Sequence, residues 1–355
     1  MNSSTPASTQ SYANPDVSQR SFIFVVGNSR SGNTMMMRML DEHSDVSGVN
    51  EVHFFENLWN TSDGDRPLPD DEGVRLVARL LAIQRDGYIQ EFDFDKHRDE
   101  ARAFVGAVPK EARTILGIFA RFLLYEAERN GKEIPCEKTP QNVFYLDEIL
   151  RYLPNVKVIN MVRDPRAVLL SQKNKGKRSD RAAYGRYRTK REDLRLRINY
   201  HPITISRLWN SSVSTGTHYL DHPQVINVRF EDLLSQSEAT VQRVCEFVGI
   251  DYQPSMLEIY AVGSSNAKDN FDEKGIKKER VHTWKQGGLN DTEIFLCQWI
   301  TRRWRRRHGY ADSPVRPNLL RLLYYYVSFP VKLVLSVLLN LNRMKSVVDA
   351  VKRRL

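Results

Sequence analysis

Two glycines and a threonine near the N-terminus have the spacing of a phosphate-binding loop. The pattern Gly27-x₄-Gly32-x-Thr34 follows an apolar run and precedes an apolar run with helical periodicity, so it predicts a strand, a tight loop and a helix. In such a loop, backbone N–H groups at the helix N-terminus bind phosphate oxygens. Asn33 stands where ATP-binding loops of this spacing carry a lysine, whereas Arg30 supplies a planar cation. The stretch therefore predicts a phosphate site that is poorly suited to ATP chemistry.

A second anion site is predicted after the clearest buried strand in the chain, residues 156–162. Arg163 follows this strand, and Pro165 is placed to begin a helix that contains Ser171. Ligands of open α/β sheets bind at the carboxyl ends of the strands. Arg163 and Ser171 are therefore predicted to bind an anion there.

Glu51 and His53 are the candidate general bases. They follow a short predicted strand at 45–51, with Glu51 at its carboxyl end. Strand alternation would place both side chains on one face. Either group could take a proton from an acceptor hydroxyl, so the residues by themselves leave the choice open.

Predicted strands and helices alternate along most of the chain. This pattern predicts an α/β fold, a P-loop-like parallel sheet with helices on both faces and a C-terminal helical tail. Residues 1–20 are polar and predict a disordered lead, residues 21–310 predict the main domain, and residues 311–355 predict a basic, apolar tail. The predicted strands are 22–27, 45–51, 133–136, 156–162 and 225–230, and the main predicted helices are 73–86, 112–129, 141–152, 165–171, 201–219, 231–248 and 291–310.

The positive charge is concentrated in the tail. Of the formal net charge of +10, residues 301–355 carry thirteen Lys or Arg against two acids, which predicts contact with an anionic surface. Residues 319–341 are mainly Leu, Val and Tyr, but Lys332 would cost about 2.5–3.5 kcal/mol in a spanning helix. We favour a helix on a membrane surface, or a shallow pair broken at Pro330. Packing against the protein body or a second subunit, and a spanning helix, are the alternatives.

The cysteines and histidines do not predict a metal site or a disulfide framework. The three cysteines, Cys136, Cys245 and Cys297, are far apart in the sequence. The histidines lack the spacing of zinc ligands. We therefore expect no metal, and the reduced thiols indicate a cytoplasmic protein.

Two motifs together resemble the nucleotide-binding motifs of the 3′-phosphoadenosine 5′-phosphosulfate (PAPS) sulfotransferases. They are Arg30-Ser31-Gly32-Asn33-Thr34 and Arg163-Asp164-Pro165-Arg166-Ala167 with Ser171. Residues 37–46 followed by Glu51 are similar to the first motif of the tyrosylprotein and Golgi-type branch. The chain departs from the family at Asn33, where the family has Thr, and at Ser29, where it has Pro.

The resemblance implies roles for individual residues. Glu51 would be the catalytic base, with His53 as the rival, and Lys138 and Arg30 would stabilise the sulfuryl group in transfer. Arg280 and Lys285 lie where the family has a loop that closes over the nucleotide. The implied donor-binding residues are Arg30, Ser31, Gly32, Asn33, Thr34, Arg163, Ser171, Arg280 and Lys285.

The sequence therefore predicts a metal-independent sulfotransferase that uses PAPS. A glycan or lipid hydroxyl is the favoured acceptor, other small molecules are alternatives, and the protein is expected to be peripheral at an anionic membrane. A homodimer is an open alternative, and nucleic acid is not the expected partner. Two competing functions are a P-loop kinase or NTPase, disfavoured by the missing loop lysine, and a non-enzymatic adaptor that binds a membrane or nucleic acid through the tail.

Overall fold

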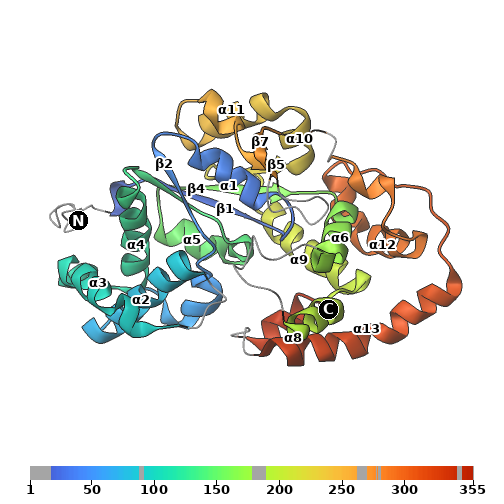
Figure 1. The fold of residues 1–355 in the computed structure, drawn as a ribbon, viewed down its shortest axis with the longest axis horizontal. Helices are drawn as coiled ribbons and strands as arrows, with labels where there is room; N and C mark the ends of the chain where they lie inside the picture. The colour runs from blue at the N-terminus through green and yellow to red at the C-terminus, as the bar shows by residue number, and fades with distance from the viewer. Residues whose placement is uncertain are drawn as a thin grey trace.

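The core of the protein is a five-stranded parallel sheet with the strand order β2-β3-β1-β4-β5 (Figure 1). The computed structural model describes residues 17–87, 92–177, 189–261, 270–276, 278, 281–341 and 346–354. The predicted P-loop-like α/β fold is confirmed. The strands are β1 (Phe22–Gly27), β2 (Val46–Val49), β3 (Ile134–Glu137), β4 (Val156–Val162) and β5 (Val225–Arg229), and a separate antiparallel pair is formed by β6 (Tyr260–Ala261) and β7 (Asn270–Lys274).

Helices cover both faces of the sheet, as Figure 1 shows. Alternate β1 side chains enter different cores: Phe22, Phe24 and Val26 pack with the cluster that includes α4, whereas Ile23 and Val25 pack with the cluster that includes α1 and α11. The α-helices are α1 (Asn33–Asp41), α2 (Asp70–Asp86), α3 (Phe94–Ala107), α4 (Ile115–Arg129), α5 (Leu146–Tyr152), α6 (Pro165–Lys173), α8 (Lys190–Asn199), α9 (Pro202–Thr217), α10 (Phe230–Ser235), α11 (Ser237–Val248), α12 (Asp291–Arg307), α13 (Leu319–Asn340) and α14 (Val347–Lys352).

Two of the predicted helices differ in the structure. Residues 231–248 were predicted as one helix, but the chain forms α10 and α11 with a break at Gln236, whose backbone is not helical. The predicted helix 141–152 begins as the 3₁₀ helix η6 (Pro140–Tyr145) before α5. The sequence analysis missed α3 and α8, which are rich in charged residues and therefore have a weak apolar period.

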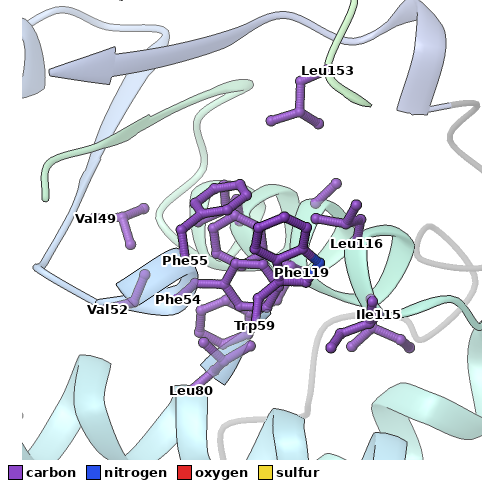
Figure 2. Close-up of a cluster of buried hydrophobic side chains, with 14 of the residues drawn as sticks. Val49, Val52, Phe54, Phe55, Trp59, Leu80, Ile115, Leu116, Phe119 and Leu153 are labelled. Carbon is purple, nitrogen blue, oxygen red and sulfur yellow. The ribbon is translucent and has the colours of Figure 1, made fainter. Parts of the chain in front are cut away.

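A cluster of aromatic side chains anchors the segment that follows β2. This segment forms the short π-helix η3 (Phe54–Leu58), and Figure 2 shows its first two side chains packed among residues of α4. The Phe54 ring stacks on Phe119 with ring centroids 3.8 Å apart, while Phe55 contacts the same ring edge-on. Both phenylalanines are buried. The aromatic contacts therefore fix the backbone directly after His53.

The tail helix α13 is continuous through Pro330, so the predicted break at this proline is wrong. Pro330 lies on the exposed side of the helix. Along the bottom of Figure 1, α13 extends beside α8. Among the described residues, α13 is a helix long and apolar enough to cross a membrane.

The two faces of α13 have the reverse of the usual polarity. Its inner face makes polar contacts with the protein body: Lys332 Nζ donates to the carbonyl oxygen of Tyr200 (3.2 Å), and Ser336 Oγ donates to Asn199 Oδ1 (2.8 Å). Its outer face is apolar. Large exposed side chains on this helix are Leu319, Leu320, Leu323, Tyr324, Tyr326, Val327, Val331, Val334, Leu335 and Leu338.

Candidate functional site

The strand order brings four predicted site segments to one edge of the sheet. β1 lies between β3 and β4, so the loop after β1 has Lys138 on one side and Arg163 on the other. Glu51 follows β2, which pairs with β3. Because all five strands are parallel, their carboxyl ends face the same edge. Segments far apart in the sequence therefore form one candidate site.

Glycine is required at both glycine positions of the loop spacing. Gly27 has φ = +130°, and a Cβ there would lie 2.4 Å from the carbonyl oxygen of Met161. Gly32 has φ = +95°, and a Cβ there would lie 2.3 Å from the Phe230 ring. A residue with a side chain would be strained at these φ angles, and its Cβ would clash with the neighbouring atoms. The loop therefore curves tightly from β1 into α1.

Arg30 joins the loop to the second predicted motif. Its Nε donates to Ser171 Oγ (2.9 Å), and Arg163 Nη1 donates to the carbonyl oxygen of Arg30 (3.0 Å). The Arg163 guanidinium also stacks on Phe230, 4.1 Å from the ring centroid. Thus, the structure brings Arg30 of the loop into contact with Arg163 and Ser171 of the second predicted motif.

Several buried polar atoms around the loop have no hydrogen-bond partner among the described residues. They are Ser31 Oγ, Asn33 Oδ1 and Arg163 Nε. The Asn33 amide nitrogen donates to the Asn28 carbonyl oxygen (3.0 Å), so at least one of its N–H bonds shapes the loop itself. Buried polar groups normally have partners. The three partnerless atoms lie beside the glycine loop and two arginines, and this arrangement fits a binding site for an anionic ligand.

Glu51 and His53 lie in the segment after β2 and outside the strand, which ends at Val49. The expectation that Glu51 ends a strand and that alternation aligns it with His53 is therefore wrong. The two side chains nevertheless meet, with His53 Nε2 3.5 Å from Glu51 Oε2. His53 has φ = +51° and Arg30 has φ = +73°; they are the two non-glycine residues with positive φ in the described part of the chain. Such strain is common at functional sites.

Charge interactions fix the protonation of this pair. Lys138 Nζ lies 2.5 Å from Glu51 Oε1, and His53 Nδ1 lies 2.9 Å from Glu56 Oε2. Burial opposes ionisation, but the bond from His53 and the charge of Lys138 outweigh it and lower the pKa of Glu51 to about 2. Burial would likewise lower the pKa of His53, but its bonds to Glu51 and Glu56 raise it to about 9. At neutral pH, Glu51 is an anion and His53 is a cation.

The sequence analysis missed two acids beside this pair. Glu56 binds His53, and its position three residues along the chain was the available signal. Glu137 is fully buried at the end of β3, where it accepts hydrogen bonds from Thr139 Oγ1 (2.5 Å) and Asn142 Nδ2 (2.7 Å). Burial raises the pKa of Glu137 to about 7. The sequence could not show that Glu137 is buried, and its burial is the cause of the raised pKa.

The predicted closing loop is only partly described. Lys285 is exposed on the 3₁₀ helix η10 (Thr283–Gln286), whereas Arg280 lies outside the described residues. The neighbouring Trp284 is buried and stacks on Arg166, 4.0 Å from its guanidinium carbon. The loop therefore contacts α6, the helix that contains Ser171.

Comparisons with known proteins point to one family. The profile of the Sulfotransferase family matches residues 22–254. A Caenorhabditis briggsae relative named as a protein-tyrosine sulfotransferase is 26% identical over 237 residues, which make up 66% of this chain and 68% of the relative. Protein-tyrosine sulfotransferase A of Caenorhabditis elegans is 23% identical over 315 residues, 84% of this chain and 69% of its own.

A solved structure shares the fold. The sulfotransferase domain of the olefin synthase from Synechococcus PCC 7002 aligns with a TM-score of 0.52 at 18% identity, covering 84% of this chain and 98% of its own. The family match includes the glycine loop, Glu51, Lys138, Arg163 and Ser171, and it spans more than half of the chain. The chain therefore belongs to the sulfotransferase family.

Proposed function

We propose that this sulfotransferase takes its sulfuryl group from PAPS and transfers it to a hydroxyl by an in-line displacement without a metal. The observation that carries the proposal is the meeting of Arg30, Arg163 and Ser171 at the glycine loop. A donor with both a 5′-phosphosulfate and a 3′-phosphate needs two adjoining anion sites. The loop and the second motif would provide them.

The donor-binding roles follow from the position of each group. Loop amides from Ser31 to Thr34 would hold the 5′-phosphate at the N-terminus of α1, while Arg163 and Ser171 would bind the 3′-phosphate. The partnerless Arg163 Nε and Ser31 Oγ support this fit. Lys285 and Arg280 would close over the nucleotide. PAPS would supply the activated sulfuryl group and a phosphate leaving group whose charge the loop amides and Arg30 would stabilise.

Glu51 is the proposed general base. It is ionised and 38% exposed, so it can accept a proton, whereas His53 with a pKa of about 9 is already protonated. A carboxylate with a pKa of about 2 is a weak base. When Lys138 turns from Glu51 toward the sulfuryl oxygens, Glu51 loses one cation and its pKa rises. His53 then keeps Glu51 in position.

These groups account for the proton and for both bonds that change in the transfer step. The acceptor O–H proton passes to Glu51 as the acceptor oxygen forms its bond to sulfur. The bond between sulfur and the bridging phosphate oxygen breaks, and its electron pair leaves with the phosphate. Lys138 and Arg30 would stabilise the charge on the peripheral and bridging oxygens.

Nucleotide-dependent thermal stability tests the donor. We expect 3′-phosphoadenosine 5′-phosphate to raise the melting temperature of the whole protein more than ADP with Mg²⁺ does, because only the former carries a 3′-phosphate. Stabilisation by ADP with Mg²⁺ alone would overturn the proposal.

The substitution Glu51→Gln tests the base. Nucleotide affinity should be unchanged, and turnover of ³⁵S-labelled donor should fall by about 10²–10⁴-fold because general-base help is lost. Glu42→Gln, at an exposed position, is the matched control. Unchanged turnover in Glu51→Gln would assign the base to His53. A screen of glycan and membrane extracts with ³⁵S-labelled donor would identify the acceptor, for which we favour a glycan or lipid hydroxyl.

The tail is the proposed membrane attachment, with the enzyme domain ending near residue 310. The outer face of α13 exposes Leu320, Val327 and Val334 by 79%, 64% and 58%, respectively, whereas Lys332 points inward to the Tyr200 carbonyl. A helix that buries its polar face and exposes its apolar face suits the boundary of a lipid bilayer. Basic residues of the tail would contact anionic head groups, and we place the protein on the cytoplasmic side.

Vesicle flotation tests this attachment. The full chain should bind vesicles of phosphatidylcholine and phosphatidylglycerol. Replacing Leu320, Val327 and Val334 with Gln should weaken binding more than tenfold, because each apolar side chain contributes roughly 1.5–3 kcal/mol when buried. Trp299→Gln, an exposed residue of α12, is the control. If the unaltered protein stays free of vesicles and instead dimerises through α13, the proposal fails.

A further inference from the structure

A cavity of about 380 Å³ lies directly beside the Glu51 and His53 segment. One wall is η3, which follows His53, and another is η6, which follows Lys138 and Thr139. Glu56 lines the cavity and binds His53 Nδ1 at 2.9 Å. The cavity is therefore bounded by the direct continuations of the two segments that carry the proposed base and cation. Its volume lies within the ~300–1,000 Å³ of small-molecule sites.

The cavity lining combines aromatic rings with side-chain amides. Phe144 and Tyr145 contribute half-buried rings, the buried Phe55 and Trp59 complete the aromatic part of the wall, and four amides come from Asn60, Gln141, Asn199 and Asn340. Rings offer flat apolar surfaces, while each amide both donates and accepts hydrogen bonds. Asn199 Oδ1 already accepts from Ser336 and Asn340, so the hydroxyls of a ligand would bind to Gln141 and to the remaining amide atoms of this group. A hexose has both an apolar ring face and many hydroxyls and therefore fits this combination.

The charges in the cavity balance. Glu56 and Asp349 face Arg353 and Arg354 in the same lining, and the Arg353 guanidinium stacks on Phe144, 3.9 Å from the ring centroid. Two carboxylates and two guanidinium groups leave no net charge. A neutral ligand is therefore favoured over a strongly acidic one, which would need an excess of cations.

The C-terminal end of α13 forms part of the same cavity. Asn340, the last residue of α13, lines it and donates to Asn199 Oδ1 (2.9 Å). Ser346 and residues from α14 onward complete this side. A ligand in the cavity would thus touch the C-terminal end of the helix whose outer face is apolar. An acceptor embedded in the bilayer by apolar chains could reach this position with its head group.

We propose that the cavity is the acceptor site and that the acceptor is a membrane-borne lipid with a neutral sugar head group, whose hydroxyl is sulfated at Glu51. This inference rests on the proposed sulfotransfer from PAPS. The rings hold the sugar face, and the amides orient its hydroxyls. The lipid chains remain in the bilayer along α13.

Transfer of ³⁵S from labelled PAPS to three acceptors tests the inference with the full-length protein. The acceptors are monogalactosyl diacylglycerol in phosphatidylcholine and phosphatidylglycerol vesicles, soluble methyl galactoside, and a tyrosine-containing peptide. We expect the vesicle-borne galactolipid to be sulfated with a kcat/KM at least tenfold above that of either soluble acceptor. Equal use of methyl galactoside would overturn the lipid assignment, and exclusive use of the peptide would overturn the sugar assignment.

Two cavity variants test the location. Phe144→Ala removes a ring face and Gln141→Ala removes an amide without deleting a fully buried side chain. Each should lower kcat/KM for the galactolipid at least tenfold, mainly through KM, while stabilisation by 3′-phosphoadenosine 5′-phosphate stays intact. Trp299→Ala is the control that should match the unaltered protein. Unchanged galactolipid kinetics in both variants would overturn the cavity assignment, whereas failure of nucleotide stabilisation in the unaltered protein would instead overturn the proposed donor.

Discussion

Glu137→Gln should make the protein more stable at alkaline pH but not at acidic pH. Glu137 is fully buried, and burial raises its pKa from 4.5 to about 7. The folded state therefore holds this proton more tightly than the unfolded chain does. The contribution of Glu137 to stability is greatest below the unfolded pKa and falls as pH rises from about 4.5 through about 7.

The magnitude follows from the difference between the two pKa values. At about 1.4 kcal/mol per pH unit, the shift of Glu137 corresponds to a loss of about 3 kcal/mol of unfolding free energy above pH 7. Glutamine cannot ionise and avoids this loss. Its carbonyl can accept from Asn142, and its amide can donate to Thr139 Oγ1, so both hydrogen-bonded neighbours keep a partner.

Urea unfolding at about pH 5 and about pH 8.5 measures the effect. We expect Glu137→Gln to equal the unaltered protein within about 1 kcal/mol at the lower pH and to exceed it by about 2–3 kcal/mol at the higher pH. Glu133→Gln, an exposed neighbour, should have no pH-dependent effect. Equal stability changes at both pH values would refute the assignment of a raised pKa to Glu137.

Three substitutions test the loop, the second motif and the aromatic anchor. Gly32→Ala should abolish the nucleotide-dependent rise in melting temperature, because its Cβ would lie 2.3 Å from Phe230 at φ = +95°; normal stabilisation would contradict this geometry. Arg163→Lys should weaken 3′-phosphoadenosine 5′-phosphate binding by about 10–100-fold in calorimetry, since it loses charge-assisted hydrogen bonds of about 1.5–3 kcal/mol; an unchanged Kd would argue against this role. Phe54→Ala should cost about 3–5 kcal/mol in urea unfolding, because it empties a buried position stacked on Phe119; a loss below about 1 kcal/mol would show that the anchor is dispensable.

The sequence predicted the parallel sheet correctly. The apolar runs of β1 and β4 are buried on both faces, so their pattern identified them as central strands. Parallel strands end at one edge, and this rule predicted that Arg163 and Ser171 lie at the carboxyl end of the sheet, where they contact Arg30 in the structure. Gly27 and Gly32 both have positive φ angles in the structure, which glycine adopts without a steric penalty.

The pairing of Glu51 with His53 was predicted for the wrong reason. Strand alternation does not apply, because β2 ends at Val49. The pair forms because His53 adopts a left-handed backbone and Phe54 is fixed by stacking on Phe119. These contacts join segments that are distant in the sequence, so local patterns cannot predict them.

The protonation states and the polarity of the tail were decided by the tertiary structure. The sequence by itself determined that Glu137 and Lys332 are ionisable and that residues 319–341 are apolar. Only the fold decided that Glu137 is buried. The fold also decided that Lys332 binds the Tyr200 carbonyl oxygen and that the apolar side of α13 is exposed. The physical reason is that a pKa and an exposed face depend on which distant segments pack against a residue, whereas strand and loop patterns depend on its neighbours along the chain.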